Sequence, residues 1–157
     1  MKERKIMPFD KNFVPALRFA VMSDIHIDDE DCIEEQRFAK ALDDLKKMCS
    51  SDERYSGFDA LVIVGDFASR GSEIQMRKVK KILDAGLPAD VRLIMTMASH
   101  EYMTDGEENA LRRFDEIFGL TPDTHAVING FDFIAVTTTG GCHFDDKKRK
   151  FISAELE

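Results

Sequence analysis

The chain has 157 residues, of which 43% are hydrophobic and 33% are charged, and its formal net charge is -8. This length and composition predict one folded domain, because no glycine, proline or serine tract is long enough to act as a linker. The acidic balance argues against a protein that binds nucleic acid through the phosphate backbone, since the basic runs are short and scattered.

The cysteines and the N-terminus bear on the compartment. Three cysteines are present, and they lack C-x-x-C spacing, so the sequence predicts neither a disulfide framework nor a thiolate zinc site. We therefore expect a reducing, cytoplasmic location. The N-terminus lacks an apolar h-region, and no stretch approaches the roughly 20 apolar residues that span a bilayer, so we expect no membrane segment.

Strand-like and helix-like segments alternate over most of the chain. Apolar runs predict strands at 17–22, 60–64 and 92–96. Apolar spacing of three to four residues predicts a helix at 33–49 and a second that begins near residue 74 and ends near Gly86 and Pro88. A third helix is expected to begin with a cap at Thr104 or Asp105 and to end at Gly119. The stripe residues of these helices are Phe38, Ala41, Leu42, Leu45, Met48 and Cys49; Ile74, Val79, Ile82 and Leu83; and Ala110, Leu111, Phe114, Ile117 and Phe118.

The pattern changes after Gly119. Apolar segments at 126–128 and 131–136 flank Asn129-Gly130, which predicts a hairpin because Asn-Gly accepts the positive φ angles of a two-residue turn. Residues 145–150 are expected to form a charged, solvated loop, and 152–155 to begin one more helix. The sequence therefore predicts an α/β domain over residues 17–157, preceded by an N-terminal extension over residues 1–16.

Candidate metal ligands follow each of the three predicted parallel strands. Asp24 and His26 come after the first, Asp66 after the second, and His100 after the third. Because the carboxyl ends of neighbouring parallel strands converge on one crevice, these side chains can meet there. Asp66 could bridge two cations about 3.5 to 4 Å apart, the separation typical of paired-metal hydrolytic sites. A nearby imidazole that is not a ligand could protonate the leaving group, and His100 suits that role.

These residues resemble the calcineurin-like metallophosphoesterase superfamily, whose pattern is Asp-x-His, Gly-Asp, Gly-Asn-His-Asp/Glu, a lone His and Gly-His-x-His. Asp24 and His26 match the first block, Gly65-Asp66 the second, and His100-Glu101 half of the third. The resemblance implies an αββα sandwich, present here as a βαβαβα unit and the start of the second sheet.

The resemblance also implies a chemistry. Asp24, His26 and Asp66 would be metal ligands, Asp66 would bridge, and His100 would be the leaving-group acid. We expect two divalent ions, with Mn, Fe or Zn suited to mixed nitrogen and oxygen ligands. The expected function is hydrolysis of a phosphoric monoester or diester by a metal-activated hydroxide, on a small phosphorylated molecule or other phosphoester substrate.

Two departures from the family pattern limit this expectation. Ala98-Ser99 stands where the family has Gly-Asn, and the Ser99 hydroxyl is a shorter and poorer ligand for the second metal than an amide oxygen. The later histidine blocks are missing, and only His125 and His143 follow His100. His143 is either a substitute ligand or an exposed loop histidine. We therefore expect a domain truncated at its C-terminus, with weak or absent catalysis.

Other readings of the sequence stay open. Arg70 either holds a substrate phosphate, as the arginine after Gly-Asp does in the protein-phosphatase branch, or is a surface arginine before a helix. The acidic run 28–31 predicts a solvated helix start rather than an extra cation site. A degraded metal site would make the protein a scaffold that binds another protein. A nucleotide-binding Rossmann domain is disfavoured, since both G-x-G-x-x-G and a P-loop are missing. A half-built second sheet would favour self-association through exposed strands.

Overall fold

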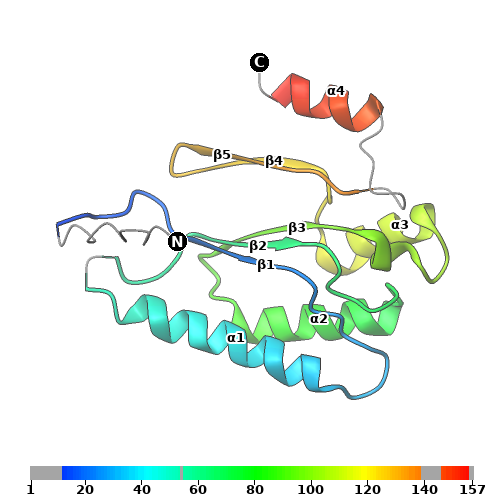
Figure 1. The fold of residues 1–157 in the computed structure, drawn as a ribbon, viewed down its shortest axis with the longest axis horizontal. Coiled ribbons are helices and arrows are strands. Elements are labelled where there is room, and N and C mark those ends of the chain that lie inside the picture. Colours follow the sequence, from blue (N-terminus) through cyan, green and yellow to red (C-terminus); the bar gives the residue numbers. More distant parts are fainter. Residues whose placement is uncertain (1–11, 54, 139–145, 156–157) are drawn as a thin grey trace, which may run out of the picture.

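The computed structural model describes residues 12–53, 55–138 and 146–155 (Figure 1). Three parallel strands form one sheet in the order β1 (Phe19–Met22), β2 (Ala60–Val64) and β3 (Arg92–Thr96). The helices are α1 (Ile33–Ser50), α2 (Glu73–Gly86), α3 (Glu107–Phe118) and α4 (Asp146–Glu155), and a short 3-10 turn, η1 (Ser99–Tyr102), follows β3. The strands β4 (Thr124–Ile128) and β5 (Phe131–Ala135) pair as an antiparallel hairpin.

The elements stack in layers. Figure 1 shows α1 and α2 on one side of the parallel sheet, the β4–β5 hairpin on the other, and α4 on the outer side of the hairpin. This arrangement confirms the predicted α/β class, with a βαβαβα unit followed by a second, antiparallel pair of strands. It also places the carboxyl ends of β1, β2 and β3 at one edge of the sheet.

The central strand β2 separates two apolar clusters. Its alternate side chains point to opposite faces, so Leu61 and Ile63 are buried against the helices, whereas Val62 packs with Ile94 and Ala135 under the hairpin. The strand therefore reads as a continuous apolar run, as predicted for a strand covered on both faces. The helix-side cluster is far larger than the hairpin-side cluster, and it anchors the strands whose ends carry the site.

Several local expectations are wrong. Helix α3 starts after Gly106, not after a cap at Thr104 or Asp105, because Thr104 donates a hydrogen bond to the Arg70 carbonyl and Asp105 pairs with Arg113.

The expected charged loop is another correction. Residues 146–150 are helical, so Ile152 to Glu155 end α4 rather than begin it. Met48 and Ile74, which belong to the apolar stripes of α1 and α2, are 66% and 56% exposed. The η1 turn was not predicted.

The carboxylate of Asp59 joins three segments at the amino end of the sheet. It accepts hydrogen bonds from the Arg18 main-chain N–H at 2.7 Å, from the Tyr55 hydroxyl, and from the Asn129 amide at 3.0 Å. Burial alone would raise the pKa of Asp59, but these hydrogen bonds together lower it below its usual value. The ionised carboxylate thus ties β1 and the hairpin turn to the start of β2.

We expect Asp59→Ala to lower the free energy of unfolding by about 2 to 3 kcal/mol, because the partners lose a charged acceptor. Urea unfolding at pH 7 measures this, with Asp43→Ala as the control, since Asp43 makes only an exposed pair with Lys47. Because the folded pKa of Asp59 is lowered, the wild type should lose this contribution as the pH falls through that pKa. Equal losses in the two variants would contradict the anchoring role.

Candidate metal centre

The loops that leave β1 and β2 continue to pair beyond the strands. The His26 N–H donates to the Asp66 carbonyl at 3.0 Å, and the Ile27 N–H donates to the Phe67 carbonyl at 3.0 Å. Ser69 donates two hydrogen bonds in the opposite direction. Its N–H donates to the Ile27 carbonyl at 2.9 Å, and its hydroxyl donates to the His26 carbonyl at 2.9 Å. This ladder holds the main chains of His26 and Asp66 side by side, although 40 residues separate them in the sequence.

Three predicted ligands have left-handed main-chain angles. The φ values are 55° at Asp24, 52° at His26 and 50° at Asp66. In the described part of the chain, Asn129 in the hairpin turn is the one other non-glycine residue with a positive φ. Such angles are uncommon outside glycine and cost of order 1 to 3 kcal/mol each, so they persist only where neighbouring contacts impose them. Their concentration here marks a site that the paired loops hold under strain.

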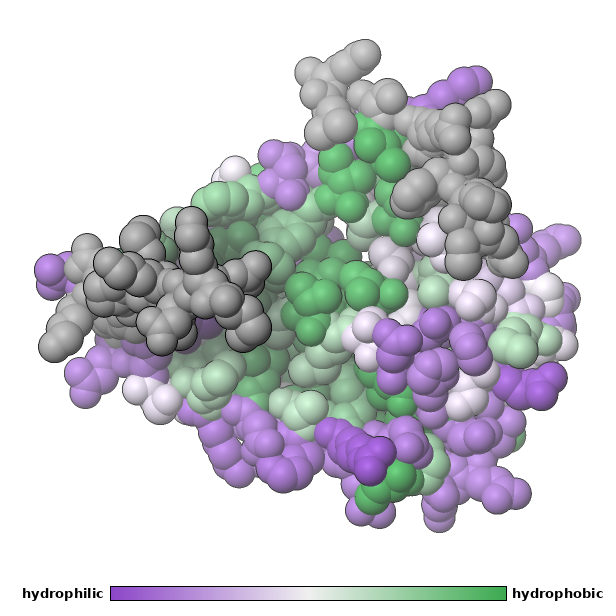
Figure 2. Space-filling model, in the orientation of Figure 1, coloured by the Kyte–Doolittle hydropathy of each residue, from purple (hydrophilic) through white to green (hydrophobic). Residues whose placement is uncertain are grey.

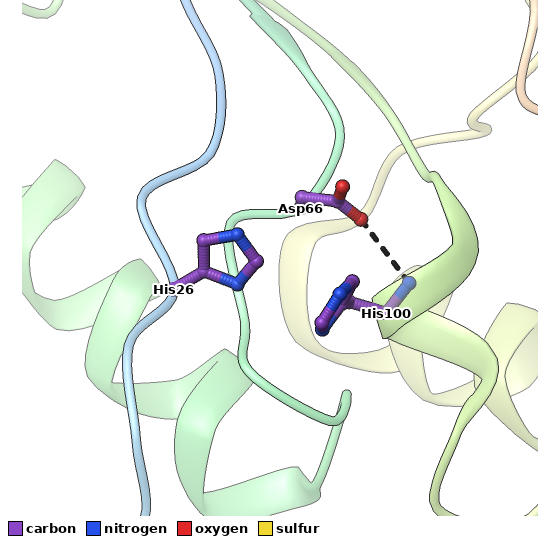
Figure 3. Close-up of side chains that lie close together, drawn as sticks. All are labelled: His26, Asp66 and His100. Atoms are coloured by element: carbon purple, nitrogen blue, oxygen red, sulfur yellow. Dashed lines mark hydrogen bonds between the residues drawn. The ribbon is translucent and has the colours of Figure 1, made fainter.

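The side chains of His26, Asp66 and His100 converge (Figure 3). One ligand atom from each lies within 4.8 Å of the other two, and the two imidazole rings meet edge to face with centroids 4.6 Å apart. His100 Nδ1 lies 2.7 Å from the Ser69 carbonyl, which can only accept, so Nδ1 carries the proton and Nε2 is left for chemistry. The His100 N–H also donates to Asp66 Oδ1 at 3.1 Å.

This geometry fits a divalent cation. Two ligands with bonds of roughly 2.1 Å to one ion can lie at most about 4.2 Å apart, close to the spacing of the three side chains. Two imidazoles and a carboxylate are donors that suit Zn, Mn and Fe. A small side-chain movement would bring the three donors onto one ion.

The other predicted site residues lie around this cluster. Asp24 is 69% exposed, with Oδ1 4.0 Å from His26 Nε2, and it accepts a hydrogen bond from Ser23. Ser99 and Arg70 are both exposed, at the start of η1 and after the paired loops. His125 is bound instead by Asp132 and Glu155 of the hairpin and α4. His143 lies outside the described residues.

The carboxylate of Glu101 is a positioning group that the sequence analysis missed. It is fully buried and accepts three main-chain hydrogen bonds, from Asp66 at 3.0 Å, Ala68 at 3.0 Å and Ala98 at 2.8 Å. Burial raises the pKa of Glu101, while the three N–H donors act in the opposite direction. The adjacent His100 was the only sequence signal, since three donors from distant loops leave no local pattern.

Two glycines let these loops close around Glu101. A Cβ on Gly65, which has φ 85°, would lie 2.4 Å from the Ala98 Cβ. A Cβ on Gly71, which has φ 71°, would lie 2.0 Å from the Glu101 carbonyl oxygen. Neither contact is tolerable, so any side chain at these positions would separate the loop after β2 from the loop after β3.

Comparison with known families identifies the family of the chain. A family model described as calcineurin-like phosphoesterase matches residues 17–153. The chain belongs to the calcineurin-like phosphoesterase family. The match confirms the predicted resemblance, and it places this metallophosphoesterase among metal-dependent phosphoester hydrolases. No curated protein gives a significant match to the chain. None of the described helices of this calcineurin-like phosphoesterase is long and apolar enough to cross a membrane.

We expect Glu101→Gln to lower the free energy of unfolding by about 2 to 4 kcal/mol, because an amide cannot accept all three N–H groups in a buried place. Zinc affinity should fall by roughly 10- to 100-fold, as when a group that orients ligands is lost. Urea unfolding and calorimetric zinc titration measure the two effects. Glu108→Gln on the exposed start of α3 is the matched control, and equal behaviour of the two variants would refute the role of Glu101.

Proposed function

We propose that this protein hydrolyses phosphoric monoesters or diesters with a divalent cation held by His26, Asp66 and Asp24. The observation that carries the proposal is the convergence of His26, Asp66 and His100 at the carboxyl ends of adjacent parallel strands. Family membership supports the same class of reaction. The substrate would be a phosphorylated small molecule or another phosphoester.

The distances support part of this ligand set. Asp24 Oδ1 lies 4.0 Å from His26 Nε2, within the roughly 4.2 Å that two ligands of one ion can span. Asp66 enters from the neighbouring strand, and its Oδ1 is oriented by the His100 N–H. A Mn, Fe or Zn ion bound there would polarise the phosphoryl oxygen and lower the pKa of an attacking water.

His100 is assigned as the general acid that protonates the leaving group. The Ser69 carbonyl accepts from Nδ1–H and orients the ring, so in the imidazolium form the Nε2–H can pass its proton to the departing alkoxide and leave the neutral Nδ1–H tautomer. The same Nε2 would also be a chemically suitable cation ligand. The two roles differ in whether metal binding survives when His100 is replaced.

Arg70 and Ser99 are assigned supporting roles. The exposed guanidinium of Arg70 would bind the phosphoryl oxygens through its planar fork. Ser99 would be the additional donor of a second cation bridged by Asp66, and its hydroxyl is weak for that purpose. We therefore expect the first cation to bind more tightly than the second, and turnover to be slow.

We expect Asp66→Asn to lose metal and His100→Gln to keep it, because only the first change removes a ligand. Elemental analysis after dialysis against Mn or Zn measures the bound ion, with Asp115→Asn on exposed α3 as control. His100→Gln should slow release of an alkoxide by about 10²- to 10⁴-fold, and nitrophenolate, which leaves without a proton, far less. Metal loss from His100→Gln would make His100 a ligand. A wild type that binds no metal and turns over neither substrate would favour the scaffold.

We also propose that two copies of the chain associate through the exposed edge strand β1 and the apolar residues of the sheet next to it. Figure 2 shows hydrophobic residues gathered between the sheet and the hairpin, where a groove of about 450 Å³ is lined by Val62, Val64, Ile94 and Phe133. Val21, on the edge strand β1, is 57% exposed. An edge strand with an apolar face can pair with the same strand of a second copy.

Val21→Lys should convert a dimer to a monomer, because a charged side chain on an edge strand opposes pairing. Sedimentation velocity at several concentrations measures the change. Val14→Lys makes the same replacement at an exposed site outside the sheet and should leave the dimer intact. A wild type that stays monomeric at high concentration would contradict self-association.

A further inference from the structure

The main chain of Arg70 is held from both sides. Its N–H donates to Gln75 Oε1 at 2.8 Å, and its carbonyl accepts from the Thr104 hydroxyl at 2.7 Å. The preceding residue, Ser69, contacts His26 and His100, and the following residue, Gly71, packs against Glu101. The Cα of Arg70 is therefore fixed relative to the candidate metal site formed by His26, Asp66 and His100.

The side chain of Arg70, by contrast, has no partner among the described residues. Within the described residues its guanidinium makes no hydrogen bond or ion pair, and the residue is exposed. Two less exposed arginines differ: Arg18 contacts Asp52 and several carbonyls, and Arg113 forms a double hydrogen bond with Asp105. A fixed main chain with an unused guanidinium is an arrangement suited to an external anion.

Gln75 does more than cap a helix. It is fully buried and exchanges hydrogen bonds with Ser72 in the capping box of α2. Its Nε2 also donates to Asp28 Oδ1 at 3.4 Å and to Asp29 Oδ2 at 3.2 Å. One carboxamide thus joins the loop after His26 to the loop that carries Arg70, and capping alone requires neither contact.

We propose that Gln75 and Thr104 are positioning residues that hold Arg70 where its guanidinium binds the phosphoryl oxygens of the substrate. This inference rests on the proposed function. A long, flexible side chain binds more tightly when its main chain is already fixed, because less freedom is lost on binding. In this proposal Gln75 and Thr104 act through Arg70, and they contact neither the side chains of the candidate metal site nor the phosphate.

A double-mutant cycle with inorganic phosphate tests the proposal without requiring turnover. The zinc-loaded, ¹⁵N-labelled full chain is titrated with phosphate, and the Kd is read from protein NMR signals that shift with phosphate, the Arg70 Nε–H among them where present. We expect Gln75→Leu to weaken phosphate binding by about 3- to 10-fold, and by no further factor when Arg70→Ala is already present. The affinity for zinc should stay unchanged in these variants. Gln36→Leu, at an exposed position of α1, is the matched control.

Thr104→Val, at an exposed position, is the second variant and should behave in the same way even if Gln75→Leu fails to fold. Equal weakening by either variant with and without Arg70 would overturn the proposal, because the effect would not pass through that side chain. A Gln75→Leu protein that is less stable but binds phosphate normally would reduce Gln75 to a helix cap. Loss of zinc from the Gln75→Leu protein would also count against the proposal, because Gln75 would then act on the loop after His26 rather than on Arg70. Failure of the wild type to bind phosphate would overturn the inference, whereas phosphate binding without ester hydrolysis would count against the proposed function alone.

Discussion

The buried carboxylate of Glu101 joins the loops that leave β2 and β3, and the geometry of the candidate metal site depends on this contact. Removing a carboxylate from water is costly, and here three main-chain N–H groups offset that cost. Two of these donors flank Phe67 in the loop that carries Asp66, and Glu101 itself follows His100. One side chain therefore sets the relative position of an acidic ligand and an imidazole from different strands.

The paired loops that leave β1 and β2 hold Asp24, His26 and Asp66 in left-handed conformations that would relax in a free chain. The ladder between residues 24–27 and 65–69 and the helix-side core offset that strain. Fixed main chains keep the ligand atoms close to one another, so little reorganisation is needed when a cation binds. The hydrogen bonds of Gln75 and Thr104 fix the main chain of Arg70 as well, so the candidate metal ligands and the proposed phosphate-binding residue share one support.

Much of this framework could be predicted from the sequence, because its signals are local. Apolar runs ending in Asp24, Asp66 and His100 indicate strands that share an edge, and Asn129-Gly130 indicates the hairpin. The roles of Glu101 and Gln75 could not be predicted, since their partners lie up to 35 and 47 residues away and leave no periodic pattern. Thr104 and Asp105 were mistaken for caps because residues that favour caps also serve tertiary hydrogen bonds. Likewise, the charged composition of 146–150 gave no sign of α4.

The central claim is that His26 and Asp66, brought together by these loops, share one cation. The most direct measurement is a crystal structure of the zinc-soaked protein with anomalous data collected at the zinc edge. The account predicts one strong peak at roughly 2.0 to 2.2 Å from an imidazole nitrogen of His26 and a carboxylate oxygen of Asp66. A peak bound by neither residue, or no peak at saturating zinc, would contradict it.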